Sequence, residues 1–222
     1  MPPGEPLFRP DWVVDNLDVI GQRLGEHVGM TATAVIVGFL ISFALALLIR
    51  RRRTLTTAVI GTAGILYAIP SLALFAFLIP FTGISFVTAE IALVSYTLLI
   101  LVRNILLGLD SVPAEVLEAA DGMGYTARQR LWRVELPIAL PIVVAGLRIA
   151  TVTTVGLVSV TALIGQGGLG YLIVVVGING FFPTATYVGA LLSVALAVAA
   201  DALLLGAQSR LTPWSRARSA TT

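Results

Sequence analysis

Long uncharged apolar stretches dominate this chain and alternate with short polar or charged segments. A helix needs about 20 apolar residues to cross the hydrocarbon core of a bilayer. Five stretches meet that requirement: residues 28–49, 57–79, 86–107, 138–164 and 184–205. The pattern therefore predicts an all-α integral membrane protein with five transmembrane helices, and six is the alternative count.

Proline and glycine interrupt the second of these stretches. Pro80 and Gly83 are predicted to end it. Pro70 lies inside it, next to Ser71, where proline is expected to kink the helix and free a backbone carbonyl.

A glycine-rich segment, "GQGGLG", follows the fourth span. The apolar run after it, residues 171–178, is too short to cross a bilayer, so it predicts a re-entrant or interfacial segment. The glycines are expected to provide flexibility or close packing where the helix breaks. They are Gly165, Gly167, Gly168 and Gly170.

The arginines favour one orientation of the five spans. With the N-terminus outside, the Arg50–Arg53 run, the central loop and the C-terminal tail all lie in the cytoplasm, and only Arg9 and Arg23 lie outside. This agrees with the positive-inside rule. A sixth span near Tyr171 would place the tail arginines outside, so the five-span count is preferred.

The two ends of the chain are expected to flank a transmembrane domain at residues 28–207. Residues 1–27 have the apolar spacing of an amphipathic helix lying at the membrane interface, and a loosely ordered tail is the alternative. Charges in this segment exclude a cleaved signal peptide. Residues 208–222 are expected to form a cytoplasmic tail.

Composition argues against an enzyme. The chain is 57% hydrophobic and 12% charged, with no cysteine and a single histidine, His27, for which a structural role is expected. It has no phosphate-binding GxxxxGK[ST] loop and no cluster of metal ligands. No metal or nucleic-acid site is therefore expected.

A secondary transporter is the main rival class, because such proteins place ionisable groups deep in the membrane. Here Glu90 and Asp201 fall toward span ends, and Arg103 and Arg148 fall toward the inner face. Interfacial solvation or pairing between helices is the expected role of these four residues, and a direct role in transport is the alternative.

The segment at residues 109–136 is the one long polar interruption, and it predicts a helix–turn–helix. Asp110 and Ser111 are candidate N-caps before Pro113. Gly122 and Gly124 are expected to end the first helix.

A second, basic helix is predicted after this turn. Thr126 and Gln129 form a potential capping box at its start, and the helix is expected to stop before Pro137. Small side chains at Ala119 and Ala120 would let another protein approach the first helix closely. An ordinary solvated loop is the alternative.

The spacing within this segment resembles the cytoplasmic signature of ABC importer permeases. That signature is EAA, three residues, Gly, nine residues, an aliphatic residue, one residue and Leu-Pro. Here the EAA of residues 118–120 is followed by Gly124, Val134, Leu136 and Pro137, with Val at the usual Ile position.

The resemblance implies the type I importer permease fold with a cytoplasmic coupling helix. That helix would fit a groove in a separate ATPase subunit, which would bind ATP and Mg, so this chain would hold no cofactor. The implied docking residues are Glu118, Ala119, Ala120, Asp121, Gly122 and Gly124. The implied supporting residues are Arg128, Arg130, Arg133, Leu136 and Pro137; alternatively, this second half is simply a helix held at the inner membrane face.

Further stretches at residues 67–80, 102–124 and 147–173 resemble permeases of the osmoprotectant branch, which import glycine betaine, choline, carnitine or proline. Implied partners are an ATPase dimer, a second permease subunit and an extracytoplasmic solute-binding protein, in the inner or plasma membrane of a prokaryote. Methionine-importer permeases share the five-span plan and the GGLG element, so an amino-acid importer is the alternative. Candidate pathway or flexibility residues are Pro70, Ser71, Tyr96 and the four glycines of the glycine-rich segment.

Overall fold

A computed structural model describes residues 6–212, and all regular elements in this range are helical. The N-terminal half contains α1 (Pro10–Asp15), α2 (Leu17–Ile49), α3 (Arg53–Ala68), α4 (Ser71–Thr82) and α5 (Phe86–Asp110). The central loop contains α6 (Ala114–Gly122), α7 (Ala127–Arg130) and the π-helical η1 (Leu131–Glu135). The remainder contains α8 (Leu136–Val160), the 3₁₀-helical η2 (Thr161–Ile164), the π-helical η3 (Tyr171–Asn179) and α9 (Pro183–Leu211).

Four helical runs in this range are long and apolar enough to cross a membrane: Leu17–Ile49, Phe86–Asp110, Ala127–Ile164 and Pro183–Leu211. The pair α3 and α4 passes the same test together but is bent by 97°. The prediction of an all-α membrane protein with five spans therefore holds when the bent pair counts as one broken span. The short η3 is not among the candidate spans.

The two prolines of the second span affect the helix differently from what was predicted. Pro70 does more than kink the helix, because α3 ends at Ala68 and α4 begins at Ser71. The carbonyl of Ile69 is left without a helical partner, and the Tyr96 hydroxyl donates a hydrogen bond to it. The prediction that Pro80 ends the span is wrong: it lies in the last turn of α4, where it disturbs little helix, and Gly83 ends the helix at φ +70°.

The N-terminal segment joins the first span without a break. After the short α1, α2 begins at Leu17 and continues to Ile49. The interfacial position of residues 1–27 stays a prediction. Of the predicted tail at 208–222, residues 213–222 lie outside the described range.

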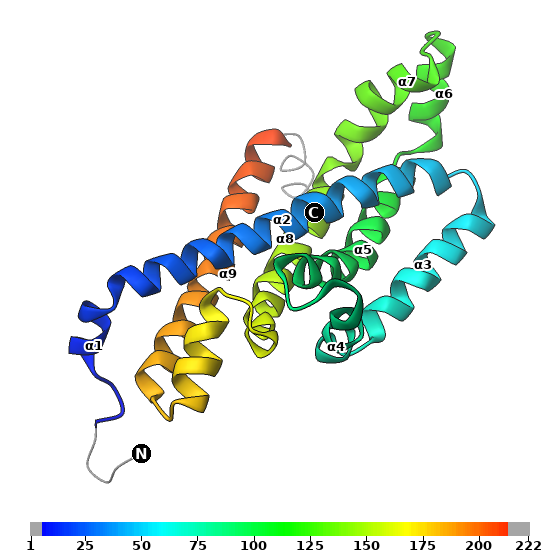
Figure 1. Ribbon diagram of the computed structural model, residues 1–222. Helices are drawn as coiled ribbons and strands as arrows, with labels where there is room; N and C mark the ends of the chain where they lie inside the picture. Colours follow the sequence, from blue (N-terminus) through cyan, green and yellow to red (C-terminus); the bar gives the residue numbers. More distant parts are fainter. Residues whose placement is uncertain (1–5, 213–222) are drawn as a thin grey trace.

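Helix α5 lies at the centre of the bundle and packs against α2, α3, α4 and α8 (Figure 1). One apolar cluster, around Phe75, Leu93 and Val158, fills the end near α4. A second, around Ile49, Ile105 and Ala139, fills the end from which α6 and α7 extend. Two apolar layers thus lie along α5.

The contact between α5 and α8 depends on a glycine. A methyl group added at Gly108 would lie 3.0 Å from the Ala139 carbonyl oxygen and 3.2 Å from the Val143 side chain. Small residues at such positions let helix backbones approach closely within a membrane.

We expect Gly108→Val to destabilise the protein by about 1–3 kcal/mol, because the larger side chain overpacks this contact. Gly64→Val in α3 is the control, since no atom lies within 4 Å of an added methyl group there. Thermal unfolding of the two purified variants in detergent measures the difference. Equal unfolding temperatures would show that the α5–α8 contact tolerates the extra volume.

Candidate functional site

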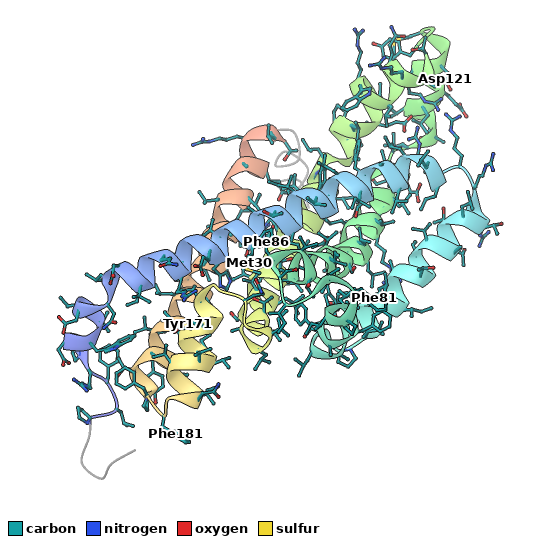
Figure 2. The ribbon with its side chains drawn as sticks, viewed as in Figure 1. Met30, Phe81, Phe86, Asp121, Tyr171 and Phe181 are labelled. Carbon is teal, nitrogen blue, oxygen red and sulfur yellow. The ribbon has the colours of Figure 1, made fainter. Side chains whose placement is uncertain are left out.

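The polar loop between α5 and α8 forms a helical hairpin that projects beyond the bundle (Figure 1). Figure 2 shows Asp121 on this projection, at the opposite end of the molecule from Tyr171 and Phe181. The predicted helix–turn–helix is therefore present, as α6 followed by α7.

The turn after α6 is a complete Schellman motif. Gly124 has φ +77°, its N–H donates to the Asp121 carbonyl at 2.9 Å, and the Tyr125 N–H donates to the Ala120 carbonyl at 3.1 Å. These two bonds satisfy carbonyls that the end of a helix leaves open. The turn confirms the predicted stop at Gly122 and Gly124.

The predicted start of α6 needs correction. Asp110 is the last residue of α5, and Ser111 is the C-cap of that helix. The N-cap of α6 is Pro113, without a side-chain cap hydrogen bond. The third span continues farther than predicted because the α5–α8 contact extends to Gly108 and supports the last turn of α5.

The start of α7 follows the sequence pattern, but its end does not. Thr126 and Gln129 form both bonds of a capping box, as predicted. The prediction that this helix stops before Pro137 is wrong, because η1 carries it directly into α8. The Leu136 N–H donates to the Leu131 carbonyl in a wider π-type turn, and this turn lets the continuous helix accommodate Pro137 directly after it.

The outer surface of α6 is formed by a subset of the predicted docking residues. Glu118, Ala119, Asp121, Gly122 and Gly124 are exposed. The expectation that Ala120 forms part of this surface is wrong, because Ala120 is 1% exposed and packs inside the chain. Met123 is 66% exposed and adds an apolar side chain that the sequence pattern did not identify.

Four charged residues connect the hairpin to the end of the first span. The Glu135 carboxylate is buried and accepts hydrogen bonds from Arg50 and from Arg130, the latter at 3.0 Å. Arg130 also pairs with Asp121 of α6. Hydrogen bonds to charged groups are about twice as strong as neutral ones. The pairs Arg50–Glu135, Glu135–Arg130 and Arg130–Asp121 therefore form one chain of charge from α2 to α6, which we call the Glu135 network.

Two members of the Glu135 network, Glu135 and Arg50, were not predicted as site residues. Glu135 is the unspecified position between Val134 and Leu136 of the signature, and Arg50 looks like an ordinary positive-inside charge. A single acid just before an apolar span was the available signal. Of the predicted supporting arginines, only Arg130 joins the network.

The other predicted supporting residues are placed differently. Arg128 and Arg133 are exposed and form no ion pair among the described residues. Leu136 packs against the apolar cluster around Ile105. An aromatic contact between Trp132 and Phe43 of α2, with ring centroids 6.3 Å apart, adds a second link from η1 to the first span.

At the opposite end, the glycine-rich segment is fixed to α2. The Gly168 N–H donates to Glu26 Oε2 at 2.9 Å, and the Leu169 N–H donates to His27 Nδ1 at 3.2 Å. Because Nδ1 accepts, Nε2 carries the proton and donates to the Val155 carbonyl at 3.0 Å. His27 is fully buried and structural, as expected.

Two of the remaining glycines pack closely here. An added methyl group at Gly167 would collide with Glu26, and one at Gly170 would collide with the Ser159 backbone. Gly165 and Gly168 have positive φ. These contacts favour close packing over flexibility.

The candidate pathway residues Pro70, Ser71 and Tyr96 meet at the break between α3 and α4. Tyr96 is 5% exposed and also contacts Tyr67 edge-on, with ring centroids 5.9 Å apart. A structural role explains these contacts. A role of the three residues in transport stays a prediction.

We expect Glu135→Ala to destabilise the protein by about 1.5–3 kcal/mol, because it removes the charged hydrogen-bond partner of the largely buried Arg50 and one of the two partners of Arg130. Glu115→Ala is the control, since Glu115 is exposed on α6 and has no ion pair among the described residues. Thermal unfolding and limited proteolysis of the loop report the change. Identical behaviour of the two variants would show that the network does not support the hairpin.

Comparisons with known proteins agree with this architecture. Residues 34–212 match the family "Binding-protein-dependent transport system inner membrane component". The osmoprotectant import permease protein OsmW of Salmonella typhimurium is 39% identical over 91% of this chain and 96% of its own length. The glycine betaine/carnitine/choline transport system permease protein OpuCB of Bacillus subtilis is 35% identical over 86% of this chain and 88% of its own.

Solved structures match as well. A chain of the MetNI methionine ABC transporter, in an inward-facing conformation, superposes with a TM-score of 0.77 at 26% identity, covering 89% of this chain and 96% of that one. This structural match and the relatives agree with the loop signature and the helical architecture. The chain therefore belongs to the binding-protein-dependent transport system inner membrane component family and is a permease subunit of an ABC importer.

Proposed function

We propose that this permease forms the membrane path of an ATP-driven importer for quaternary ammonium compatible solutes such as glycine betaine, carnitine or choline. The observation that carries the proposal is the similarity over most of the chain to relatives named for osmoprotectants and for these three solutes. Two permease subunits, identical or paralogous, would enclose the path. Two ATPase subunits would bind ATP and Mg, and an extracytoplasmic binding protein would deliver the solute.

In this proposal, α6 is the element on which the ATPase acts. Its exposed surface at Glu118, Ala119 and Gly122 projects from the bundle, so a partner can reach it without displacing a membrane helix. The Schellman turn fixes one end of α6, and the Glu135 network ties it to α2. A push on α6 would therefore move the ends of α2 and α8 together.

The orientation follows from the same assignment. ATP is cytoplasmic, so the end with α6 and Arg50 faces the cytoplasm. The glycine-rich segment, with Arg23 and Glu26, then faces outward. Arg50 bonds to Glu135 of the loop, which supports placing both on one side of the membrane, as the positive-inside rule favours.

An amino-acid importer is the second candidate. The structural match to a methionine transporter supports it, but that match is 26% identical, whereas the osmoprotectant relative is 39% identical. The osmoprotectant class is therefore preferred.

Reconstitution into liposomes tests the proposal. With the ATPase, the binding protein and internal ATP, we expect accumulation of radiolabelled glycine betaine, carnitine or choline against a gradient. Vesicles with an ATPase that binds but does not hydrolyse ATP are the control. Uptake that continues without ATP hydrolysis would instead indicate a secondary transporter, and accumulation of methionine alone would indicate the amino-acid class.

We expect Glu118→Lys to reduce ATP-dependent uptake at least about tenfold, since a reversed charge at a docking surface costs on the order of 1.4 kcal/mol or more. Membrane insertion should be unchanged, because Glu118 is exposed and has no ion pair among the described residues.

Asp18→Lys makes the same charge change on an exposed residue of α2 at the opposite end and is the matched control. Co-purification of the ATPase separates lost docking from lost transport. Normal uptake and normal ATPase binding by Glu118→Lys would show that α6 is not the docking element.

A further inference from the structure

One ion pair lies on the outer face of the bundle, between α8 and α9. Arg148 Nε donates to Asp201 Oδ1 and Arg148 Nη2 donates to Asp201 Oδ2, both at 2.8 Å. The two side chains are 25% and 35% exposed. The third guanidinium nitrogen, Nη1, has no hydrogen-bond partner within residues 6–212.

Contacts along α8 place this pair near the middle of the membrane, deeper than the sequence pattern predicted for Arg148 and Asp201. Ala139 packs on Gly108 in the last turn of α5, so we take it as the reference for one end of the span. At about 1.5 Å per residue, Arg148 lies roughly 14 Å deeper than Ala139. Val155, which His27 contacts near the other end, lies roughly 10 Å beyond Arg148. The hydrocarbon core is about 30 Å thick, so Arg148 is far from both surfaces.

The surroundings of the pair form an open groove. A cavity of about 610 Å³ runs between α8 and α9, lined by Ala145, Ile149, Val152 and Val198 as well as the pair. On the α9 side nothing covers it, because all buried residues of that helix lie in its first turns, from Thr184 to Gly189. The α2 helix lies against the other side of α8, where Thr151 and Val155 face it.

Contact with lipid is energetically unfavourable for this groove, because it contains two ionisable residues. Ionisable residues at mid-membrane depth almost always face the bundle interior or a water-filled cavity. Within this chain, however, Arg148 and Asp201 lie on the outside. The groove must therefore face either water in the transport path or a second subunit.

We propose that the Arg148–Asp201 groove lines the transport path and binds a zwitterionic solute such as glycine betaine or carnitine. The free Nη1 of Arg148 would hold its carboxylate, and Asp201 would lie beside its quaternary ammonium group. The apolar walls at Ile149 and Val152 suit the methyl groups. This inference deepens the proposed function and rests on it.

Cysteine labelling tests whether the groove contains water and solute. The chain has no cysteine, so Val152→Cys creates a unique thiol. The probe is a methanethiosulfonate that carries a trimethylammonium group, applied to the complete reconstituted complex. Leu40→Cys is the control: it is 62% exposed on α2 and lies about 14 Å from Ile49, at a similar depth.

We expect the probe to label Val152→Cys but not Leu40→Cys. A saturating concentration of the zwitterion that the complex imports, glycine betaine or carnitine, should slow labelling about tenfold by occupying the groove. Import of choline alone would overturn the inference, because choline has no carboxylate. Val198→Cys replaces Val152→Cys if the latter does not import. Absent labelling, or labelling without protection, in a complex that still imports with ATP would overturn the inference and leave the proposed function intact. A disulfide between two Val152→Cys chains, formed where the probe does not label the reduced thiol, would identify the groove as a closed subunit interface and also overturn it.

Charge substitutions test the roles of the pair. Arg148→Gln should lower kcat/KM for a zwitterionic solute by about 10- to 100-fold, the range for losing a hydrogen bond to a charged group. Arg210→Gln, at an exposed arginine in the last turn of α9 without an ion pair in the described range, should leave it unchanged. The exchange Arg148→Asp with Asp201→Arg restores the bridge with reversed polarity. Full recovery of import by this double variant would show that the pair only joins α8 to α9.

Discussion

Close contact between α5 and its neighbours is the constraint on which the rest of the structure depends. Apolar burial drives helix association weakly inside a bilayer, because lipid is as apolar as the side chains. Association then relies on close backbone packing, and α5 achieves it through small residues on both sides. Gly38 of α2 leaves room for Thr97 of α5, and Gly108 of α5 leaves room for Ala139 of α8. With α2 and α8 held against one central helix, the loop that leaves α5 and returns through α8 starts from two fixed positions.

Because α5 and α8 hold both ends of the loop, the polar hairpin outside the membrane has a defined position. Phe43 and Trp132 brace it on the apolar side, while the Glu135 network braces it on the polar side. A buried ion pair is costly to form, and breaking it costs more. The network is therefore better understood as a device that fixes the position of α6 relative to α2 than as a source of net stability. Such a connection is suited to transmitting displacement from an ATPase to the spans.

Backbone groups exposed by helix breaks find partners in distant elements. The Ile69 carbonyl, freed at Pro70, receives the Tyr96 hydroxyl, and the Gly168 and Leu169 N–H groups donate to Glu26 and His27. Within a membrane such groups cannot rely on water, so each break requires a polar side chain on another helix. The candidate pathway residues at these breaks therefore have structural roles that account for their presence. Arg148 and Asp201 differ, because their pairing leaves a charged surface open at mid-membrane depth.

Sequence alone determined the features that depend on local chemistry. The apolar lengths placed the spans, and Gly124 and the Thr126–Gln129 box placed the turn, because caps are decided within a few residues. The ends of α5 and α7 were not predicted correctly. Asp110 resembles an N-cap, but packing extends α5 to this residue. Pro137 resembles a helix stop, but a π-turn carries α7 into α8. Only the tertiary structure decided that Ala120 is inside, that Glu135 joins Arg50, and that Arg148 meets Asp201 across two helices. Those outcomes depend on which helix faces lie against each other, and residues far apart in the sequence give no local signal of that.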